Sequence, residues 1–313
     1  MKNSITKRLR NLIYNPWHYV FLFFYKTSRL WPDKFYLSIL YRSLQGCWIN
    51  WREPHTFQEK IQYLKLYGYK DEYTTYVDKL LVKQYVAQKL GNEYLIPTLG
   101  VWDRVCDIDW VNLPSQFVLK TTHGGGGCGV VICHDKKDFD VVTASRKLQN
   151  SMISNAGYLY RERPYTNVKR RVFAEAYMKD MDSSSKDLSD YKFFCFNGEP
   201  KYCQVIRDRS TKETIDFYDM NWNLMPFVGL NPVARNGLNP VAKPQNIQSM
   251  IELCRILSEG IPFVRIDLYN ITGKPYFGEM TFYPASGFGT FTPSEWNIKL
   301  GNLIKFELDE KVI

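Results

Sequence analysis

Two patterns follow one another along this sequence and together predict an α+β fold. The first 70 residues carry helical patterns that are interrupted at Pro16, Pro32 and Pro54. From Asp190 onward, short apolar stretches with a period of two residues are joined by turn residues, as in antiparallel sheets. Between these parts, a glycine-rich stretch separates two short apolar strands. We therefore expect helices first and antiparallel sheets afterwards.

The helical part contains a recognisable start and a short apolar run. Thr56 can cap a helix, and Glu59, three residues later, can complete a capping box. The run at residues 20–25 has basic residues on both sides and is far shorter than the roughly 20 residues that span a bilayer. We favour a helix packed on the domain. The alternative is peripheral contact with a membrane surface through residues 1–50.

The rest of the chain divides into alternating helices and strands. A second helix is expected over residues 74–90, ending at Gly91. Residues 116–120, 129–133 and 171–178 fit strands, and residues 137–155 and 244–260 fit helices. The pair 191–196 and 201–207 flanks Asn197-Gly198, a strong hairpin signal. A second hairpin is expected from residues 263–269 and 276–281, and residues 183–185 are expected as a surface loop.

Charge and cysteine content limit the classes of function. The formal net charge of +9 favours an anionic partner such as a nucleotide, an acidic sugar or a membrane surface. The basic residues are scattered, and neither an RNA-recognition signature nor a zinc-finger spacing is present, so we expect no nucleic-acid partner. The 7 cysteines are dispersed without a CxxC pair, which is typical of reduced thiols in a cytoplasmic protein. No small-residue cleavage site follows the early apolar run, so we expect no signal peptide.

The glycine-rich stretch begins where a strand ends on a lysine. Lys120 is followed by His123 and then by four consecutive glycines. Glycines let backbone N–H groups approach a polyphosphate closely, and a lysine adds a point charge. The alternative is a flexible hairpin, but ordering four glycines costs conformational entropy, so we favour phosphate binding. His123 is a further candidate for a phosphate contact. The four glycines are Gly124, Gly125, Gly126 and Gly127.

The second predicted hairpin carries two carboxylates and an arginine. Alternation puts Arg265 and Asp267 on one face of the first strand. It puts Glu279 and Thr281 on one face of the returning strand. Asp267 then lies within roughly 8 Å of Glu279. Because magnesium takes oxygen ligands, this arrangement predicts a Mg²⁺ site with phosphate contacts; the alternative is an Arg–Glu ion pair on a solvated face.

Two weaker signals complete the candidates. The apolar strand that contains Glu175 could line a nucleotide pocket, although ordinary buried strands share its pattern. Residues 107–109 and 180–182 match the Asp-x-Asp pattern of metal-dependent sugar transferases. We discount both matches, because the pattern is common by chance and both lie in loop-like, acidic surroundings.

The order of these pieces resembles the ATP-grasp fold: a lysine-ended strand, a glycine-rich loop, a strand with a glutamate, and Arg-x-Asp followed twelve residues later by Glu. More closely, the sequence resembles the TupA-like ATP-grasp proteins, which are associated with bacterial capsule, teichuronopeptide and other surface-polysaccharide pathways. The resemblance extends over residues 30–305. It rests on Thr56-Phe57-Gln58-Glu59-Lys60, Asp78-Lys79, Tyr94-Leu95-Ile96-Pro97, Phe117-Val118-Leu119-Lys120, Asp190-Tyr191-Lys192-Phe193-Phe194 and residues 278–287.

This resemblance implies two α/β lobes whose antiparallel sheets clamp ATP, preceded by a helical N-terminal region. The N-terminal region would cover residues 1–70, and the ATP-grasp domain residues 71–313. Within the domain, the small lobe would lie at about 112–178 with its glycine-rich loop at 124–129, and the metal-binding lobe at about 179–305.

The resemblance also implies roles for single residues. Lys120 would bind the α and β phosphates, with Lys79 and Lys192 close to the nucleotide. Asp267 and Glu279 would hold Mg²⁺, and Arg265 would stabilise the transferred phosphoryl group. The wider superfamily places Asn where Thr281 stands, and a hydroxyl is a weaker ligand for a second metal ion. The adenine hinge would consist of Glu175, Ala176, Tyr177 and Met178.

The implied function is an ATP-dependent ligase that activates a carboxylate as an acyl phosphate and joins it to an amine. The family context indicates an acidic sugar such as a uronic acid, and an amino acid or amino alcohol. The alternatives are a sugar or glycan kinase of the same fold, a glycosyltransferase, and a non-catalytic binding protein. We expect a cytoplasmic location, with the inner face of the membrane as the alternative. The sequence leaves the oligomeric state open.

Overall fold

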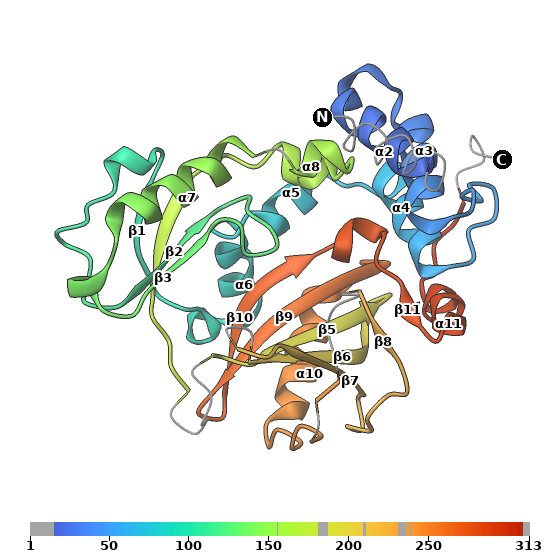
Figure 1. Ribbon diagram of the computed structural model, residues 1–313. Coiled ribbons are helices and arrows are strands. Elements are labelled where there is room, and N and C mark those ends of the chain that lie inside the picture. The colour runs from blue at the N-terminus through green and yellow to red at the C-terminus, as the bar shows by residue number, and fades with distance from the viewer. Residues whose placement is uncertain are drawn as a thin grey trace.

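The protein is described from a computed structural model (Figure 1). The described residues are 16–154, 156–180, 187–208, 211–230, 236–237 and 239–308. Helices followed by antiparallel sheets confirm the predicted α+β class. The loop expected at residues 183–185 and Asp182 of the second Asp-x-Asp match lie outside the described residues.

Helices form the first part of the described chain, as predicted. Pro16 is the first residue of α2, Pro32 precedes α3, and Pro54 stands shortly before α4. The predicted capping box is confirmed: the Glu59 N–H donates to the Thr56 hydroxyl, and the Thr56 N–H donates to the Glu59 carboxylate. The elements are α2 Pro16–Lys26, η1 Ser28–Leu30, α3 Asp33–Gln45 and α4 Phe57–Tyr67.

The next helical segment is broken where a single helix was expected. The prediction of one helix over residues 74–90 is wrong, because α5 Glu72–Val77 and α6 Val82–Leu90 are separate helices. Asp78 has an extended backbone, and its side chain accepts hydrogen bonds from the N–H groups of Leu80 and Leu81. This side-chain turn replaces helical hydrogen bonds, which is why the helix stops and restarts. Gly91 ends α6, as expected.

The first sheet has four antiparallel strands in the order β1-β4-β2-β3. Its core contains Phe117, Leu119 and Val172, and α7 covers one face through Ala144 and Leu148. The glycine-rich loop connects β2 to β3, which are neighbours in the sheet. The strands are β1 Thr98–Trp102, β2 Phe117–Thr121, β3 Val130–Cys133 and β4 Val172–Ala176, and α7 is Val141–Ile153.

The second sheet has five antiparallel strands in the order β10-β9-β5-β6-β7. Both predicted hairpins are confirmed: β5 pairs with β6 across Asn197-Gly198, and β9 pairs with β10. Helix α10 packs on this sheet, and the main hydrophobic core joins residues of the sheet and of α10 with residues of α4, α5 and α6. The elements are β5 Asp190–Phe196, β6 Glu199–Arg207, β7 Thr214–Asp219, α10 Ile247–Ser258, β9 Phe263–Ile271 and β10 Lys274–Thr281.

Short elements join these parts. In Figure 1 the two sheets lie side by side, and α5 and α6 run beside the region where they meet. Within the described residues, no helix combines the length and apolarity that a bilayer-spanning segment requires. The boundary at residue 70 and the limits of the lobes stay predictions. The remaining elements are η2 Asn92–Tyr94, η3 Val105–Asp107, η4 Lys136–Asp138, α8 Ala156–Leu159, α9 Arg163–Thr166, β8 Val228–Gly229, η5 Pro284–Gly287, β11 Phe291–Thr292 and α11 Glu295–Leu303.

Candidate active site

Four side chains of the β9–β10 hairpin meet on one face of the second sheet. The Arg265 guanidinium donates to both Asp267 carboxylate oxygens, at 2.6 and 2.7 Å. It also donates to the Thr281 hydroxyl at 3.1 Å and to Glu279 at 3.3 Å. In the strand register, Glu279 stands opposite Asp267 and Thr281 opposite Arg265. The shared face that alternation predicts is therefore confirmed.

A bulge in β10 sets this register. The pairing shifts between Phe277 and Glu279, which leaves Gly278 as the extra residue. A Cβ atom at Gly278 would lie 3.0 Å from the Asp267 carbonyl oxygen, so the strands approach closely at this point. Bulges re-aim neighbouring side chains, and this one turns Glu279 towards Asp267.

Two lysines add positive charge to the hairpin carboxylates. Lys192 stands opposite Asp267 on β5 and forms an ion pair with it. The Lys79 ammonium lies 2.7 Å from Glu279. Burial raises the pKa of the Glu279 carboxyl, but Lys79, Lys192 and Arg265 outweigh burial and hold the pKa well below its usual range. Glu279 is therefore ionised at neutral pH, as a metal ligand must be.

Lys79 reaches Glu279 because of the turn between α5 and α6. Asp78 holds the turn through its bonds to Leu80 and Leu81. The Lys79 N–H donates to the Thr122 carbonyl at 3.0 Å, which ties the turn to the end of β2. On the other side of Asp78, the Arg171 guanidinium lies 3.7 Å from the carboxylate. The break between α5 and α6, which the sequence did not predict, thus places the Lys79 ammonium between the two sheets.

In the first sheet, a buried carboxylate joins two lysines. Glu175 lies 2.5 Å from the Lys83 ammonium and 2.6 Å from the Lys120 ammonium. Burial lowers the pKa of Lys120, but the charge of Glu175 outweighs burial and leaves that pKa raised. Lys83 also donates to the Ile96 carbonyl at 2.7 Å. Both Glu175 oxygens therefore hold cations in place.

The glycine-rich loop has a packed base and an open tip. A side chain at Gly124 or Gly129 would collide with the Thr121 hydroxyl, which forms a 2.8 Å hydrogen bond with Ser151. At the tip, Gly126 and Gly127 have positive φ angles of 57° and 76°, a conformation that glycine adopts without strain. A Cβ atom on any tip residue from 125 to 127 would meet nothing within 4 Å. The tip has room for a ligand.

His123 lies at the base of this loop. Its Nε2 is 3.0 Å from the Ser151 carbonyl oxygen, and its Nδ1 is buried without a hydrogen-bond partner among the described residues. Burial lowers the pKa of His123, so the ring is neutral at pH 7. A phosphate contact through this residue stays a prediction.

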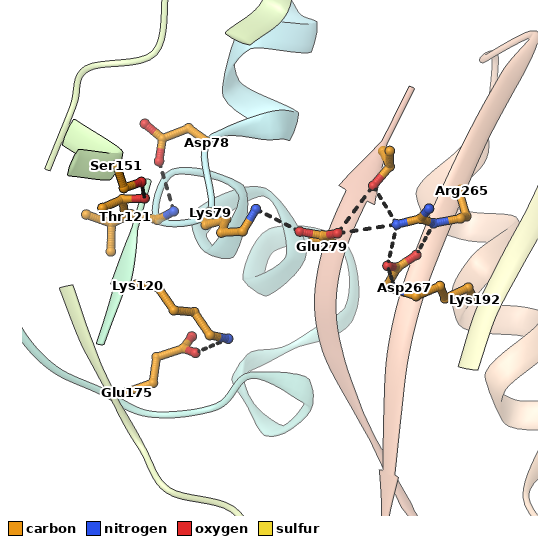
Figure 2. Close-up of polar contacts among 12 residues, drawn as sticks. Asp78, Lys79, Lys120, Thr121, Ser151, Glu175, Lys192, Arg265, Asp267 and Glu279 are labelled. Carbon is orange, nitrogen blue, oxygen red and sulfur yellow. Dashed lines mark hydrogen bonds and ion pairs between the residues drawn. The ribbon is translucent and has the colours of Figure 1, made fainter. Parts of the chain in front are cut away.

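Figure 2 shows the charged side chains of the two sheets facing one another. Lys120 and Glu175 come from the first sheet, and Arg265, Asp267 and Glu279 from the second, with Lys79 between them. Electrostatic coupling agrees with the picture, because Glu279 is among the charges that raise the pKa of Lys120. The site therefore consists of two networks of paired cations and carboxylates, one on each sheet, which face each other.

The hairpin offers Mg²⁺ a suitable set of donors. Asp267, Glu279 and Thr281 present only oxygen atoms, and all three lie within hydrogen-bond reach of one guanidinium. Among the described residues, no group of three or more His, Cys, Asp or Glu side chains could hold a metal ion alone. Mg²⁺ commonly uses one or two carboxylates and completes its shell with phosphate oxygens and water. The donors fit such a shared site, and their role as ligands stays a prediction.

The other residues of the expected adenine hinge lie at the end of β4 and directly after it. Ala176 ends β4, and its N–H donates to the Pro97 carbonyl at 3.0 Å. Tyr177 contacts His134 edge to face, and Met178 is half-buried after the strand. The adenine hinge at 175–178 thus stays a prediction, and the Glu175 carboxylate is already engaged by lysines.

The Asp-x-Asp match at residues 107–109 lies in surface turns. Asp107 pairs with Arg104 at 2.7 Å, and Asp109 accepts from Asn112 at 2.7 Å. Both aspartates thus serve local turns.

Sequence reasoning missed Lys83 and the Thr121–Ser151 contact. Lys83 pairs with Glu175, which lies 92 residues further along the chain, so no local pattern connects them. Ser151 lies 30 residues from Thr121, and no local pattern connects them.

Comparisons with solved structures find proteins of similar arrangement. A D-alanine–D-alanine ligase from Bacillus anthracis complexed with ATP is 14% identical over 66% of this chain and 54% of that chain, with a TM-score of 0.36. The Helicobacter pylori ligase of the same name is 15% identical over 86% of this chain and 69% of that chain, with a TM-score of 0.37. Phosphoribosylamine–glycine ligase from Thermotoga maritima is 15% identical over 67% of this chain and 48% of that chain, with a TM-score of 0.40.

The chain thus spans about half the length of the Bacillus anthracis ligase. Structural similarity with TM-scores of 0.36, 0.37 and 0.40 does not assign an activity to this chain. No curated protein matches the sequence.

The sequence itself matches a defined family. Residues 59–305 match the family described as TupA-like ATPgrasp. This span includes both sheets, the glycine-rich loop, and the Lys120, Arg265, Asp267 and Glu279 side chains. The chain therefore belongs to the TupA-like ATP-grasp family.

Proposed function

We propose that this protein is an ATP- and Mg²⁺-dependent ligase that joins a carboxylate to an amine. One observation carries the proposal: Asp267 and Glu279 lie beside Arg265 and pair with Lys192 and Lys79, and Lys120 faces them from the first sheet. Polyphosphate binding needs several fixed cations, and phosphoryl transfer with magnesium needs oxygen ligands beside them. Few other reactions need both fixed cations and carboxylate oxygen ligands in one site.

The residues divide into holding and transferring roles. Lys120, kept protonated by Glu175, would hold the α and β phosphates, with Lys79 and Lys192 close to the nucleotide. The open tip of the glycine loop would lie over the γ-phosphate. Asp267, Glu279 and Thr281 would hold Mg²⁺, which supplies positive charge to the phosphate oxygens. Arg265 would neutralise charge that develops on the transferred phosphoryl group.

The reaction proceeds in two displacements. A substrate carboxylate oxygen forms a bond to the γ-phosphorus, the bond from that phosphorus to the β-phosphate oxygen breaks, and ADP leaves. An amine nitrogen then bonds to the acyl carbon, the carbon–oxygen bond to phosphate breaks, and the nitrogen loses a proton. The products are an amide, ADP and phosphate. Exclusion of water by the lobes would protect the acyl phosphate from hydrolysis.

The substrate class follows from the family and from charge. We propose an acidic sugar, such as a uronic acid, as the carboxylate, and an amino acid or amino alcohol as the amine, in capsule or other surface-polysaccharide biosynthesis. A cation-rich site suits an acidic sugar. The main alternative is a sugar or glycan kinase with the same nucleotide site, which would transfer the phosphoryl group to a hydroxyl. A glycosyltransferase finds less support, since Asp107 and Asp109 serve surface turns.

The test measures ADP release and hydroxamate formation together. Purified protein receives Mg·ATP and a panel of uronic acids, with either an amine or hydroxylamine, which traps acyl phosphates as hydroxamates. The double variant Asp267→Asn/Glu279→Gln is the blank. Arg146→Gln/Lys147→Gln, two exposed residues of α7, is the matched surface control.

A ligase releases ADP only with acid and amine together and gives a hydroxamate with hydroxylamine. Both signals should be lost in the blank and kept in the control. ADP release with a sugar and without hydroxamate would establish the kinase instead. Absence of ADP release with every acid, together with absence of Mg·ATP binding, would overturn the assignment.

A further inference from the structure

Helices α2 and α3 and the short segments next to them carry exposed apolar side chains that the active site does not use. We call these side chains the N-terminal patch; it consists of Phe23, Leu30, Phe35, Leu44 and Trp48. Leu30 is 75% exposed, Trp48 58% and Phe23 55%. Figure 1 shows α2 and α3 at one end of the molecule, beside α4 and away from the first sheet. Ring contacts join Phe23 to Trp31 and Trp31 to Phe35, so exposed side chains of α2 and α3 adjoin one another and point to a binding surface.

Helix α2 has an apolar composition that is typical of a buried helix, but its side chains are not fully buried. Eight of its eleven residues are apolar or aromatic, yet none of the eleven is buried. Phe21 and Phe24 pack partly against Tyr36 and Leu40 of α3. The other apolar side chains of α2 are partly buried, except Phe23, which is exposed. Two aromatic clusters mark the ends of α2: Phe23 with Trp31, and Trp17 with Trp48, at ring distances of 6.4 and 5.8 Å.

Positive charge is concentrated in the same part of the chain. Residues 1–52 contain nine of the 41 lysines and arginines but only one of the 32 acidic residues, Asp33. They therefore carry eight of the nine net positive charges, although the basic residues looked scattered along the sequence. Asp33 is itself paired with Arg161 at 2.6 Å. Lys26, Arg29 and Lys34 are exposed beside the apolar side chains.

The patch is fixed to the rest of the molecule. Arg161, which precedes α9, donates to the carbonyls of Ser28 and Trp31 at 2.6 and 3.2 Å. Its guanidinium also lies 4.1 Å from the centre of the Tyr36 ring. The Tyr36 hydroxyl donates to the Leu159 carbonyl at 3.0 Å. A partner bound at the patch would thus hold the whole ATP-grasp body in one orientation.

We propose that the N-terminal patch docks this protein on an anionic lipid surface. Aromatic and aliphatic side chains flanked by lysines and arginines are the signature of helices that lie in the membrane interface. Tryptophans at the boundary favour the headgroup region, where an apolar ring meets polar groups. Anionic lipids attract each nearby lysine or arginine, and the exposed side chains of Lys26, Arg29 and Lys34 complement such a surface. Binding is peripheral, through the surfaces of α2 and α3.

The same charge argues against two other occupants. A second copy of the chain would bring two strongly positive surfaces together, and like charges across an interface are unfavourable. A single-stranded nucleic acid would match the charge and the aromatic rings, but Leu30 and Leu44 offer it no stacking surface. The test below distinguishes each of these two occupants from a lipid surface.

The test is vesicle flotation of the full chain. Vesicles of phosphatidylcholine alone are compared with vesicles that also contain phosphatidylglycerol. The apolar variant is Phe23→Ser/Leu30→Ser, and the charge variant is Lys26→Glu/Lys34→Glu. Helix α7 supplies matched controls: Val142→Ser/Ile153→Ser, which are 68% and 77% exposed, and Arg146→Glu/Lys147→Glu. Thermal unfolding and light scattering establish folding and oligomeric state for each protein, and fluorescence anisotropy of a labelled single-stranded oligonucleotide measures nucleic-acid binding.

The wild type should float with phosphatidylglycerol vesicles and stay in solution with phosphatidylcholine alone. Each patch variant should lose about tenfold or more of its partitioning, with unchanged thermal unfolding, whereas the α7 controls keep it. Added salt should weaken binding. Absence of flotation with either lipid would overturn the proposal. The proposal would also be overturned if the wild type formed a dimer that only the patch variants dissociate, or if it bound an oligonucleotide and no vesicles. Flotation of the patch variants to the same extent as the wild type would overturn it as well.

Discussion

At the scale of single residues, the site consists of carboxylates that are each shared between cations. Glu175 joins Lys83 and Lys120, and Glu279 joins Lys79 and Arg265. Sharing fixes the positions of long, flexible lysine side chains before any ligand binds. Removal of Glu175 would leave Lys83 and Lys120 without this carboxylate, whereas removal of Glu279 would leave Arg265 still paired with Asp267.

Replacing Glu279 by glutamine should lower stability in a pH-dependent way. The pKa of Glu279 is depressed in the folded protein, so its contribution is present above the unfolded value of about 4.3 and is lost as pH falls towards the folded value. At pH 7 we expect a loss of about 1–3 kcal/mol, reduced from the value for a fully buried pair by partial exposure. Urea unfolding of both proteins at pH 7 and pH 3 measures this. An equal difference at both pH values would contradict the assignment.

Replacing Thr281 by asparagine should strengthen metal binding. Thr281 lies within 3.5 Å of Glu279 and 3.1 Å of the Arg265 guanidinium, so a longer oxygen donor can reach the same position. A carboxamide oxygen is a ligand for hard cations such as Mg²⁺. We expect half-maximal ADP release at a lower Mg²⁺ concentration, by about threefold, which corresponds to a gain of about 0.7 kcal/mol. Thr281→Val should show the opposite shift, and a variant pair that shifts together would contradict a ligand role.

At the scale of elements, local patterns predicted the hairpins well and longer contacts poorly. The β9–β10 pairing follows from alternation and a short turn, so Asp267 and Glu279 could be matched from the sequence. The break at Asp78 could not, since helix propensity continues through it and a single side chain overrides it. Strand β1 was missed because its sequence, Thr-Leu-Gly-Val-Trp, does not alternate between polar and apolar residues, and none of these residues is buried. Lys83 was missed because its partner Glu175 is far away in sequence.

The base and the tip of the glycine loop should respond differently to alanine. Gly129→Ala should lose about 1–3 kcal/mol, since its side chain would collide with the Thr121 hydroxyl that bonds Ser151. Gly125→Ala meets nothing within 4 Å and should unfold like the wild type. Thermal unfolding compares the two. Equal stability of both variants would show that the loop base is not packed as described.

Removing the Asp78 side chain should loosen the turn that presents Lys79. Asp78→Ala deletes two hydrogen bonds to backbone N–H groups, at 2.9 and 3.1 Å, and should cost about 0.5–2 kcal/mol, like the loss of a helix cap. Nucleotide affinity should fall as well, because Lys79 loses its fixed position. Asp78→Asn keeps an acceptor and should restore most of the stability. If affinity stays at the wild-type level in Asp78→Ala, the turn has no part in nucleotide binding.

At the scale of the whole molecule, two sheets contribute opposite halves of one site, and the N-terminal helices add a charged apolar surface. Neither feature is local in sequence: Lys120 and Glu279 are separated by most of the ATP-grasp region. The family pattern could indicate that these residues act together, whereas spacing alone could not. The exposure of α2 could not be predicted either, because an apolar run looks the same whether its helix is covered or not.

Calorimetric titration of Mg·ATP tests the central claim most directly, because the claim is that one nucleotide contacts both lobes. Wild type, Lys120→Met and Glu279→Gln are compared, with Lys147→Met on α7 as the matched control. We predict binding by the wild type and the control, and at least about tenfold weaker binding, or about 1.4 kcal/mol, in each of the other two. Wild-type affinity in Lys120→Met or in Glu279→Gln, or no binding by the wild type, would contradict a nucleotide site built from both sheets.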